Sequence, residues 1–191
     1  RLFRRLGDEA LPFYYQLKDD SDSDILAAVS TTSADLRFLD VDIWAENLVE
    51  LSNHELPVVR RNLVPSLREY FETFPDDTRK LLPVMWQDGD EVVRTRMREL
   101  LIKMSDISST QFGARITDLN QHGCDLSALW RLMDARRKGS SKAWKSWLSG
   151  EGEMPETIET MRHVSTMQAP EELPDLSEAL ETLDEELGFL D

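Results

Sequence analysis

This sequence of 191 residues has little cysteine, little histidine and no long apolar run. Its one cysteine, Cys124, excludes an internal disulfide framework and fits a reducing compartment, so we expect an intracellular protein, cytoplasmic or nuclear. Structural zinc commonly needs paired cysteines among its four ligands, which this chain cannot supply. No apolar stretch approaches the roughly 20 residues of a membrane-spanning helix. We therefore expect no metal, no cofactor and no membrane contact.

Motifs for catalysis are also missing. Carboxylate pairs are so frequent here that their presence says nothing about acid–base chemistry. Cys124 has only His122 near it in the sequence, on a turn, and a structural thiol is the favoured interpretation. Four aspartates within residues 19–24 lack the glycine and the final glutamate of a calcium loop, and they indicate a solvated turn with Asp24 as a helix cap. We expect neither an enzyme nor a small-molecule substrate.

Acidic charge is concentrated at the C-terminal end. Residues 151–191 hold thirteen acidic side chains against one basic side chain, Arg162. This balance of −12, out of a formal net charge of −15, leaves only −3 for residues 1–150. An appended acidic segment explains this distribution better than adaptation to salt, which would spread the charge over the whole surface. We expect two parts, residues 1–150 and an acidic helical tail over residues 151–191.

An apolar pattern occurs twice, at a constant spacing, in the middle of the chain. Val58-Val59-Arg60 returns as Val92-Val93-Arg94, and matching apolar residues return with it. The matching pairs are Leu48 and Leu82, Leu51 and Met85, Leu63 and Met97, and Leu67 and Leu101. A fixed period of about 20 to 50 residues is typical of stacked repeats, in which one unit buries its apolar face against the next. Each copy is predicted to be a pair of helices, over residues 41–74 and 75–108.

Local signals place the helix boundaries within these copies. Pro57 suits the first turn of the helix predicted over residues 57–74, and Pro65 inside it predicts a kink. Asp88 is expected to cap the next helix, with Glu91 reaching back to its amide. The same period predicts a third unit over residues 111–120 and 125–138, with Asp125 as a cap, followed by a short helix over residues 142–149.

These residues resemble the HEAT-repeat family. The family pattern has a proline in the first helix, an aspartate in the turn and a basic residue at the start of the second helix; Pro83, Asp88 and Arg94 match it. In the earlier copy Arg60 matches, but His54 replaces the aspartate, so a ladder of turn aspartates and arginines would be broken there. The resemblance implies a right-handed α-solenoid of about three helix pairs, with degenerate units before and after the clearest two. Since the chain begins without methionine, further repeats can precede it.

Basic residues suggest the surfaces that meet a partner. The ridge arginines, on successive second helices, could align along one side or could merely pair with turn carboxylates; they are Arg60, Arg61, Arg94, Arg96 and Arg98. The basic cluster could neutralise phosphates or receive an acidic peptide, including the chain's own tail; it comprises Arg131, Arg136, Arg137, Lys138, Lys142 and Lys145. Trp144 and Trp147 could either cap the core or contact a partner.

The acidic tail carries leucines three and four residues apart, which predicts an amphipathic helix. Its apolar stripe contains Leu173, Leu176, Leu180, Leu183, Leu187 and Leu190, with Phe189 beside it. The tail could cap the last repeat, bind a groove on another protein, or mask the basic cluster. We expect docking through Leu176, Leu180, Leu183, Leu187 and Phe189.

By resemblance to HEAT proteins, the implied function is that of a non-enzymatic scaffold or adaptor. It would bind another protein through the solenoid surface and the acidic tail, as a subunit of a larger assembly. The alternative is a nucleic-acid-binding protein that uses the ridge arginines and the basic cluster, with the acidic tail as a mask.

Overall fold

The structure is a computed structural model that describes residues 2–137 and 140–156. Within these ranges the chain is helical and contains no strand, so the predicted all-α class is confirmed. The elements are α1 (Leu2–Leu6), η1 (Gly7–Ala10), α2 (Leu11–Lys18), α3 (Ser23–Thr32), η2 (Ser33–Phe38), α4 (Val41–Ser52), α5 (Pro57–Leu63), η3 (Val64–Ser66), α6 (Leu67–Thr73), α7 (Pro75–Trp86), α8 (Glu91–Ile107), α9 (Ser109–Gln121), α10 (Ser127–Arg137) and α11 (Ser141–Leu148), where η marks a 3₁₀ turn.

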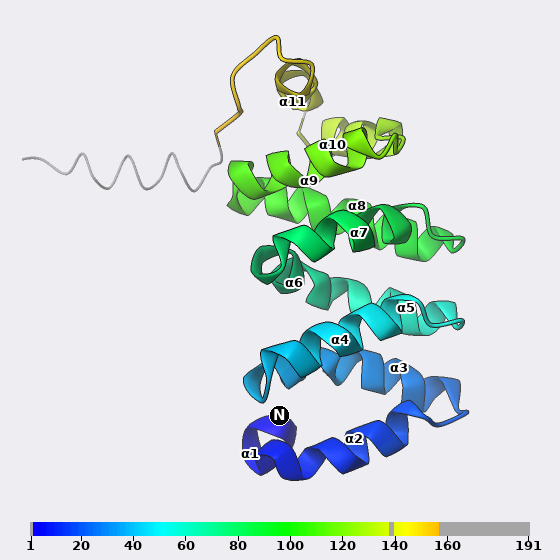
Figure 1. Ribbon diagram of the computed structural model, residues 1–191. Helices are drawn as coiled ribbons and strands as arrows, with labels where there is room; N and C mark the ends of the chain where they lie inside the picture. The colour runs from blue at the N-terminus through cyan, green and yellow to red at the C-terminus, as the bar shows by residue number, and fades with distance from the viewer. Residues whose placement is uncertain (1, 138–139, 157–191) are drawn as a thin grey trace, which may run out of the picture. The chain divides into compact units, whose positions relative to one another are not determined.

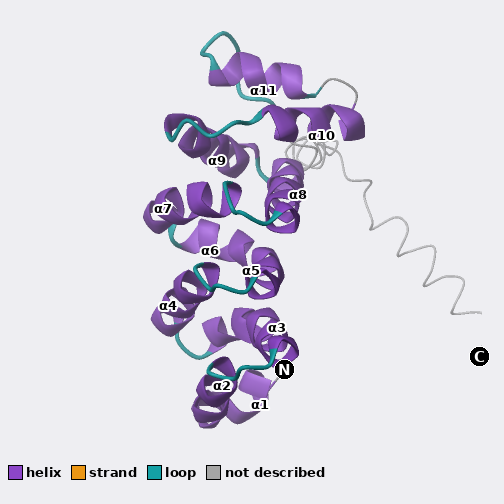
Figure 2. Cartoon of the chain, turned by 90° about the vertical axis from the view of Figure 1, so that its right-hand side faces the viewer, coloured by secondary structure: helices purple, strands orange, loops and turns teal. Residues whose placement is uncertain are grey.

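In space, the helices of residues 2–156 are arranged in the same order as in the sequence, from α1 at the bottom of Figure 1 to α11 at the top. They lie in two layers: α2, α4, α7 and α9 form one, and α3, α5, α8 and α10 form the other (Figure 2). In the middle of the chain each helix packs on its partner and on the next helix of its own layer, as α7 does on α8 and α9 and as α5 does on α4 and α8. One continuous core therefore runs between the layers.

The repeated apolar pattern corresponds to equal burial. Leu48 and Leu82, Leu51 and Met85, Leu63 and Met97, and Leu67 and Leu101 are all at most 1 % exposed. In α8 most of the buried apolar side chains recur three and four residues apart, which places them on one face of the helix; they are Val93, Met97, Leu100, Leu101 and Met104. Matching positions of the two copies thus occupy the same environment in two successive helix pairs.

Pro65 interrupts its helix as predicted. The α-helix α5 ends at Leu63, residues 64–66 form the 3₁₀ turn η3, and α6 begins at Leu67. Proline lacks the amide hydrogen that an α-helix interior requires and crowds the preceding turn. The kink keeps Leu63 and Leu67 buried on either side of the break, since both side chains are 0 % exposed.

Two predicted helix caps are wrong, because in each case a neighbouring aspartate takes the role. Asp22, with an extended backbone, caps α3 by accepting the amides of Asp24 and Ile25, so Asp24 lies inside the helix. Asp90, and not Asp88, caps α8 through the amides of Val92 and Val93. In both turns two aspartates stand close together in the sequence. Only the backbone conformation decides which carboxylate faces the free amides.

The third predicted helix pair is present as α9 and α10. Asp125 accepts the amide of Ser127 at 2.8 Å, and α10 begins at Ser127, slightly later than predicted. Residues 157–191 of the predicted acidic helical tail, which include all its leucines, lie outside the described residues.

Candidate partner-binding surfaces

Arg60 bridges two successive helix pairs. Its Nε and Nη2 donate to the two carboxylate oxygens of Asp88 at 2.7 and 2.9 Å. Its Nη1 donates to the carbonyl oxygens of His54 and Glu55 at 2.5 and 3.0 Å. Burial alone would raise the pKa of Asp88, but the hydrogen bonds from Arg60 and from the Asp90 amide outweigh it and hold that pKa below its usual value. The bidentate pair therefore joins α5 to the turn between α7 and α8.

Arg61 makes a second, parallel connection. Its Nε donates to Asp90 Oδ1 at 2.8 Å, and its Nη2 bonds the other oxygen of the same carboxylate. Asp90 also caps α8, so one carboxylate serves two purposes. The hydrogen bond from Arg61 is the main reason that the pKa of Asp90 lies far below its usual value.

The other three ridge arginines are also held within the chain. Arg94 bonds Glu91 and the carbonyl oxygen of Asp88, and Arg98 reaches the same Glu91 at 3.1 Å. Arg96 Nη1 donates to the carbonyl oxygen of Arg61 at 2.6 Å and to Asn62 Oδ1 at 3.2 Å. This arrangement favours the interpretation that the ridge arginines pair with turn carboxylates and backbone carbonyls over the interpretation that they offer free charges to a partner.

The ladder of turn aspartates is short, because its other positions carry histidine. His54 stands where the earlier turn would need an aspartate, and its Nδ1 accepts the amide of Leu56 at 3.1 Å. The position that corresponds to Asp88 in the next unit is occupied by His122, which contacts the carbonyl oxygen of Asp118. Arg94 consequently turns to Glu91 in its own helix.

The described members of the basic cluster lie on α10 and α11 and differ in accessibility to a partner. Arg136 pairs with Glu99 at 3.2 Å on the surface, and Lys145 stands 5.9 Å above the Trp130 ring. Arg131 and Lys142 are exposed. Lys138 and the side chain of Arg137 fall outside the described residues.

Trp144 is buried, with only 5 % of its surface exposed. Its ring contacts the rings of Phe112 and Trp147 edge-on, with ring centroids 4.6 Å and 5.7 Å apart, respectively. Trp147 is half-buried. The burial of Trp144 against α9 favours the interpretation that it caps the core over the one in which it contacts a partner. The tail residues Leu176, Leu180, Leu183, Leu187 and Phe189 lie outside the described residues, and their docking stays a prediction.

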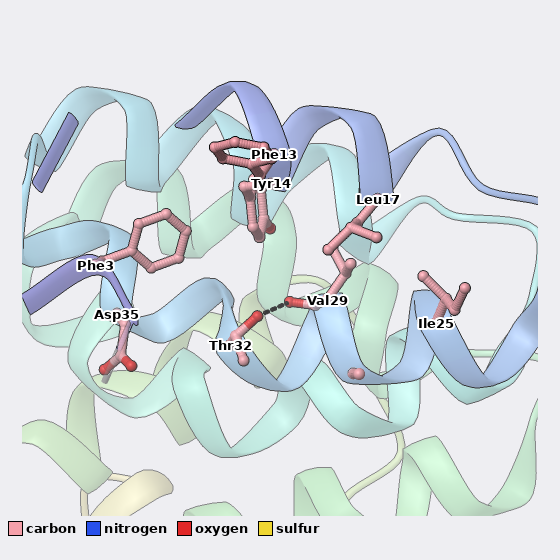
Figure 3. A pocket seen from close by; sticks show the side chains of 9 residues that line it. Phe3, Phe13, Tyr14, Leu17, Ile25, Val29, Thr32 and Asp35 are labelled. Atoms are coloured by element: carbon pink, nitrogen blue, oxygen red, sulfur yellow. Dashed lines mark hydrogen bonds between the residues drawn. The ribbon is translucent and has the colours of Figure 1, made fainter. Parts of the chain in front are cut away.

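An apolar groove between α2 and α3 was not predicted from the sequence. It encloses about 290 Å³. Figure 3 shows Phe13, Tyr14 and Leu17 of α2 on one wall and Ile25, Val29 and Thr32 of α3 on the other, with Phe3 and Asp35 at one end. The hydroxyl of Thr32 donates to the carbonyl oxygen of Val29 at 3.0 Å, so this polar side chain is satisfied within its own helix. The groove is thus lined mostly by hydrocarbon.

The walls of this groove are open to solvent. Phe13 is 61 % exposed and Leu17 is 44 % exposed, whereas Tyr14 beside them is buried. The Tyr14 hydroxyl accepts a hydrogen bond from Asn47 of α4 at 2.8 Å, and burial raises the pKa of Tyr14. The signal in the sequence is that α2 has apolar residues around more of its circumference than one packed face needs. They are Leu11, Phe13, Tyr14, Tyr15 and Leu17.

The remaining reactive side chains belong to the packing of the protein. Cys124 is buried, and Gln87 Nε2 lies 3.3 Å from its sulfur. Arg115 and Asp118 of α9 form a buried ion pair at 3.6 Å. Arg79 of α7 forms a second ion pair with Asp118, at 3.4 Å. Among the described residues no group of three or more histidine, cysteine, aspartate or glutamate side chains could hold a metal ion. None of the described helices is both long and apolar enough to cross a membrane.

Comparison of the chain with protein-family models, with curated proteins and with solved structures found no match.

Proposed function

We propose that this chain is a non-enzymatic scaffold or adaptor of the HEAT-like, right-handed α-solenoid type, and that it binds another protein as part of a larger assembly. The observation that carries the proposal is the apolar groove between α2 and α3, with Phe13 and Leu17 exposed on its wall. Large apolar side chains gathered in an open groove are typical of protein-interaction sites, because their burial by a partner is favourable.

Equivalent interactions in the two copies of the repeated pattern support the HEAT-like part of the proposal. Nη1 of Arg60 donates to the carbonyl oxygen of His54 in the preceding turn, and Nη1 of Arg94 does the same to Asp88. The matching apolar residues of the two copies share their burial. A repeating contact of this kind is what a stack of similar units requires, since each unit meets only its neighbours.

The groove is tested with an amphipathic helix of zero net charge as the probe. The probe is a labelled peptide of about 18 residues, or five helical turns, with leucines three and four residues apart and equal numbers of lysine and glutamate between them. Fluorescence anisotropy measures its binding to the full chain. Phe13→Asp should weaken binding at least about tenfold, because an anchor in the groove is lost and a charge is introduced among apolar groups.

Phe38→Asp is the matched control, since Phe38 is 47 % exposed and lies outside the groove. It should leave the affinity for the probe unchanged. Circular dichroism checks that both variants retain the helical content of the parent chain. Equal binding by the parent chain and by the folded Phe13→Asp variant would reject the groove as the docking site.

A second function, nucleic-acid binding, is supported by one observation: Arg131 and Lys142 are exposed on α10 and α11. If these residues neutralise phosphates, the affinity for single-stranded DNA should fall steeply with salt and should drop in an Arg131→Ala/Lys142→Ala variant. Filter binding at two salt concentrations measures this. An unchanged affinity in the double variant would exclude this surface from the function.

A further inference from the structure

The dimensions of the groove between α2 and α3 suit a row of side chains from a helix. Its α3 wall runs from Ile25 to Thr32, which is two helical turns or about 10 Å. Its volume of about 290 Å³ is at the lower limit for small-molecule pockets, which span about 300–1,000 Å³. An amphipathic helix that lies in a groove inserts side chains at three- and four-residue spacing over such a length. The occupant that fits is therefore a helix with two or three apolar anchors.

The turn that joins the two walls is strongly acidic. We call it the acidic turn; it comprises Asp19, Asp20 and Asp22, together with Asp24 in the first turn of α3, and it lies in the sequence between Leu17 and Ile25 of the groove. Asp20 accepts the amide of Asp22 at 2.8 Å, and Asp22 accepts that of Asp24 at 2.7 Å, so the carboxylates of Asp20 and Asp22 are fixed in place. No lysine or arginine occurs between residues 19 and 36.

The nearest basic side chain on the α2 wall is already neutralised. Lys18 pairs with Glu50 of α4 at 2.5 Å, and that lysine side chain is only 13 % exposed. One end of the groove therefore presents negative charge to any helix that docks there, and complementary charge favours a positive partner at this end.

From this juxtaposition we infer that the groove binds an amphipathic helix of a partner protein that has leucine-like anchors and basic residues positioned over the acidic turn. This inference rests on the proposed function, which supplies the groove as a docking site, and adds the chemistry of the partner. It also excludes the chain's own tail as the favoured occupant of the groove. The tail has leucines at suitable spacing, but residues 151–191 carry a balance of −12, which the acidic turn would repel.

Two probe peptides that differ only in charge test the inference. One has the sequence of residues 171–191 of this chain, which contains acidic residues and no basic ones. The other has lysine in place of every aspartate and glutamate and keeps each leucine. Both are labelled, and their binding to the full chain is measured by fluorescence anisotropy at physiological salt. The lysine peptide should bind at least about tenfold more tightly than the acidic peptide.

Three variants locate the contact. Asp19→Asn/Asp24→Asn should weaken binding of the lysine peptide about three- to tenfold, because two exposed ion pairs with the peptide would be lost. Asp42→Asn/Glu46→Gln makes the same charge change at exposed positions of α4 and should have no such effect. Asp42 is a matched position, because Asp24 and Asp42 each donate an amide to the aspartate that caps their helix. Phe13→Asp should also weaken binding, whereas attraction to net charge alone would make it stronger.

The outcomes separate the inference from the proposed function. Equal, Phe13-dependent binding of both peptides would retain the groove and overturn the preference for a basic helix. Tighter binding of the acidic peptide would overturn the inference in favour of the chain's own tail. Binding of the lysine peptide that Phe13→Asp leaves unchanged or strengthens would reject the inference, whereas the groove itself is decided by the neutral probe. Equal weakening by the α4 control and the acidic-turn variant would also reject the acidic turn as the contact.

Discussion

At the scale of single residues, the turn Asp88-Gly89-Asp90 joins the start of α8 to two arginines of the preceding helix pair. Asp88 holds the guanidinium of Arg60, and Asp90 holds that of Arg61 while it caps α8. Bidentate contacts between arginine and carboxylate are specific in geometry, so they fix one turn against the preceding helix. The ridge arginines, which the sequence suggested as a surface for a partner, thus act mainly between successive helix pairs of the chain itself.

These carboxylates make stability depend on acid pH. The pKa values of Asp88 and Asp90 are lowered in the folded chain, so their contribution is fully present above their unfolded pKa, about pH 4. It is lost as the pH falls through the lower folded values. Asp90→Asn keeps a good helix cap but removes the charge that pairs with Arg61. We expect this variant to be less stable at pH 7 and to lose stability less steeply below about pH 4.

Urea unfolding at a series of pH values between about 2 and 7 measures this difference. Asp90→Ala, which also removes the cap, should be less stable than Asp90→Asn at every pH. Identical pH profiles for the parent chain and Asp90→Asn would show that the pair with Arg61 contributes nothing to folding.

At the scale of elements, close packing of α9 on α11 depends on a residue without a side chain. A Cβ atom added to Gly113 would lie 2.9 Å from Trp147 Cη2 and 3.1 Å from Met154 Cε. Real Cβ atoms essentially never approach another atom under 3.0 Å. The glycine therefore allows the last described helix to cover the core beside Trp144.

Gly113→Leu should destabilise the protein by about 1–3 kcal/mol, the usual cost of forcing extra atoms into a packed contact. Leucine is a better helix former than glycine, so a loss of stability cannot come from helix propensity. Gly89→Leu is the control, because nothing lies within 4 Å of the position of its added Cβ. Thermal unfolding compares the two. If the Gly113→Leu variant is as stable as the parent chain, α11 can move away from the added side chain without loss of folding free energy, and the close contact is not needed for stability.

At the scale of the whole described stack, the helices differ in how many neighbours cover them. The central helix α8 packs against α5, α7, α9 and α10, whereas α2 packs mainly on α3 and η1. A helix with fewer packed neighbours unfolds locally at a lower free-energy cost, because it loses fewer buried contacts. One wall of the groove, α2, is consequently among the less covered elements, which suits a surface that must admit a partner.

Hydrogen exchange should show this gradient. Amides of α7 and α8 should exchange more slowly than those of α2, by a factor that mass spectrometry of peptic fragments can resolve. Addition of the lysine peptide should slow exchange in α2 and α3 and leave α7 and α8 unchanged. Slower exchange in α2 than in α8, without the peptide, would contradict the packing described above.

Local sequence accounts for the helical class, the repeated apolar pattern, the kink at Pro65 and the approximate position of most helices. These features depend on local preferences and on apolar periodicity, which are written in neighbouring residues. The caps at Asp22 and Asp90 could not be predicted in this way, because paired aspartates offer two equal candidates and only the backbone conformation distinguishes them.

The roles of the surface residues, in contrast, follow from the tertiary structure alone. Arg60 and Asp88 are distant in the sequence, and the bond between them exists because the stacking of helices brings one turn against the preceding helix. The groove beside Phe13 likewise depends on the separation of α2 and α3, which no periodicity reveals. Whether a charged or apolar side chain serves the fold or a partner is set by its neighbours in space, and those neighbours are distant in the chain.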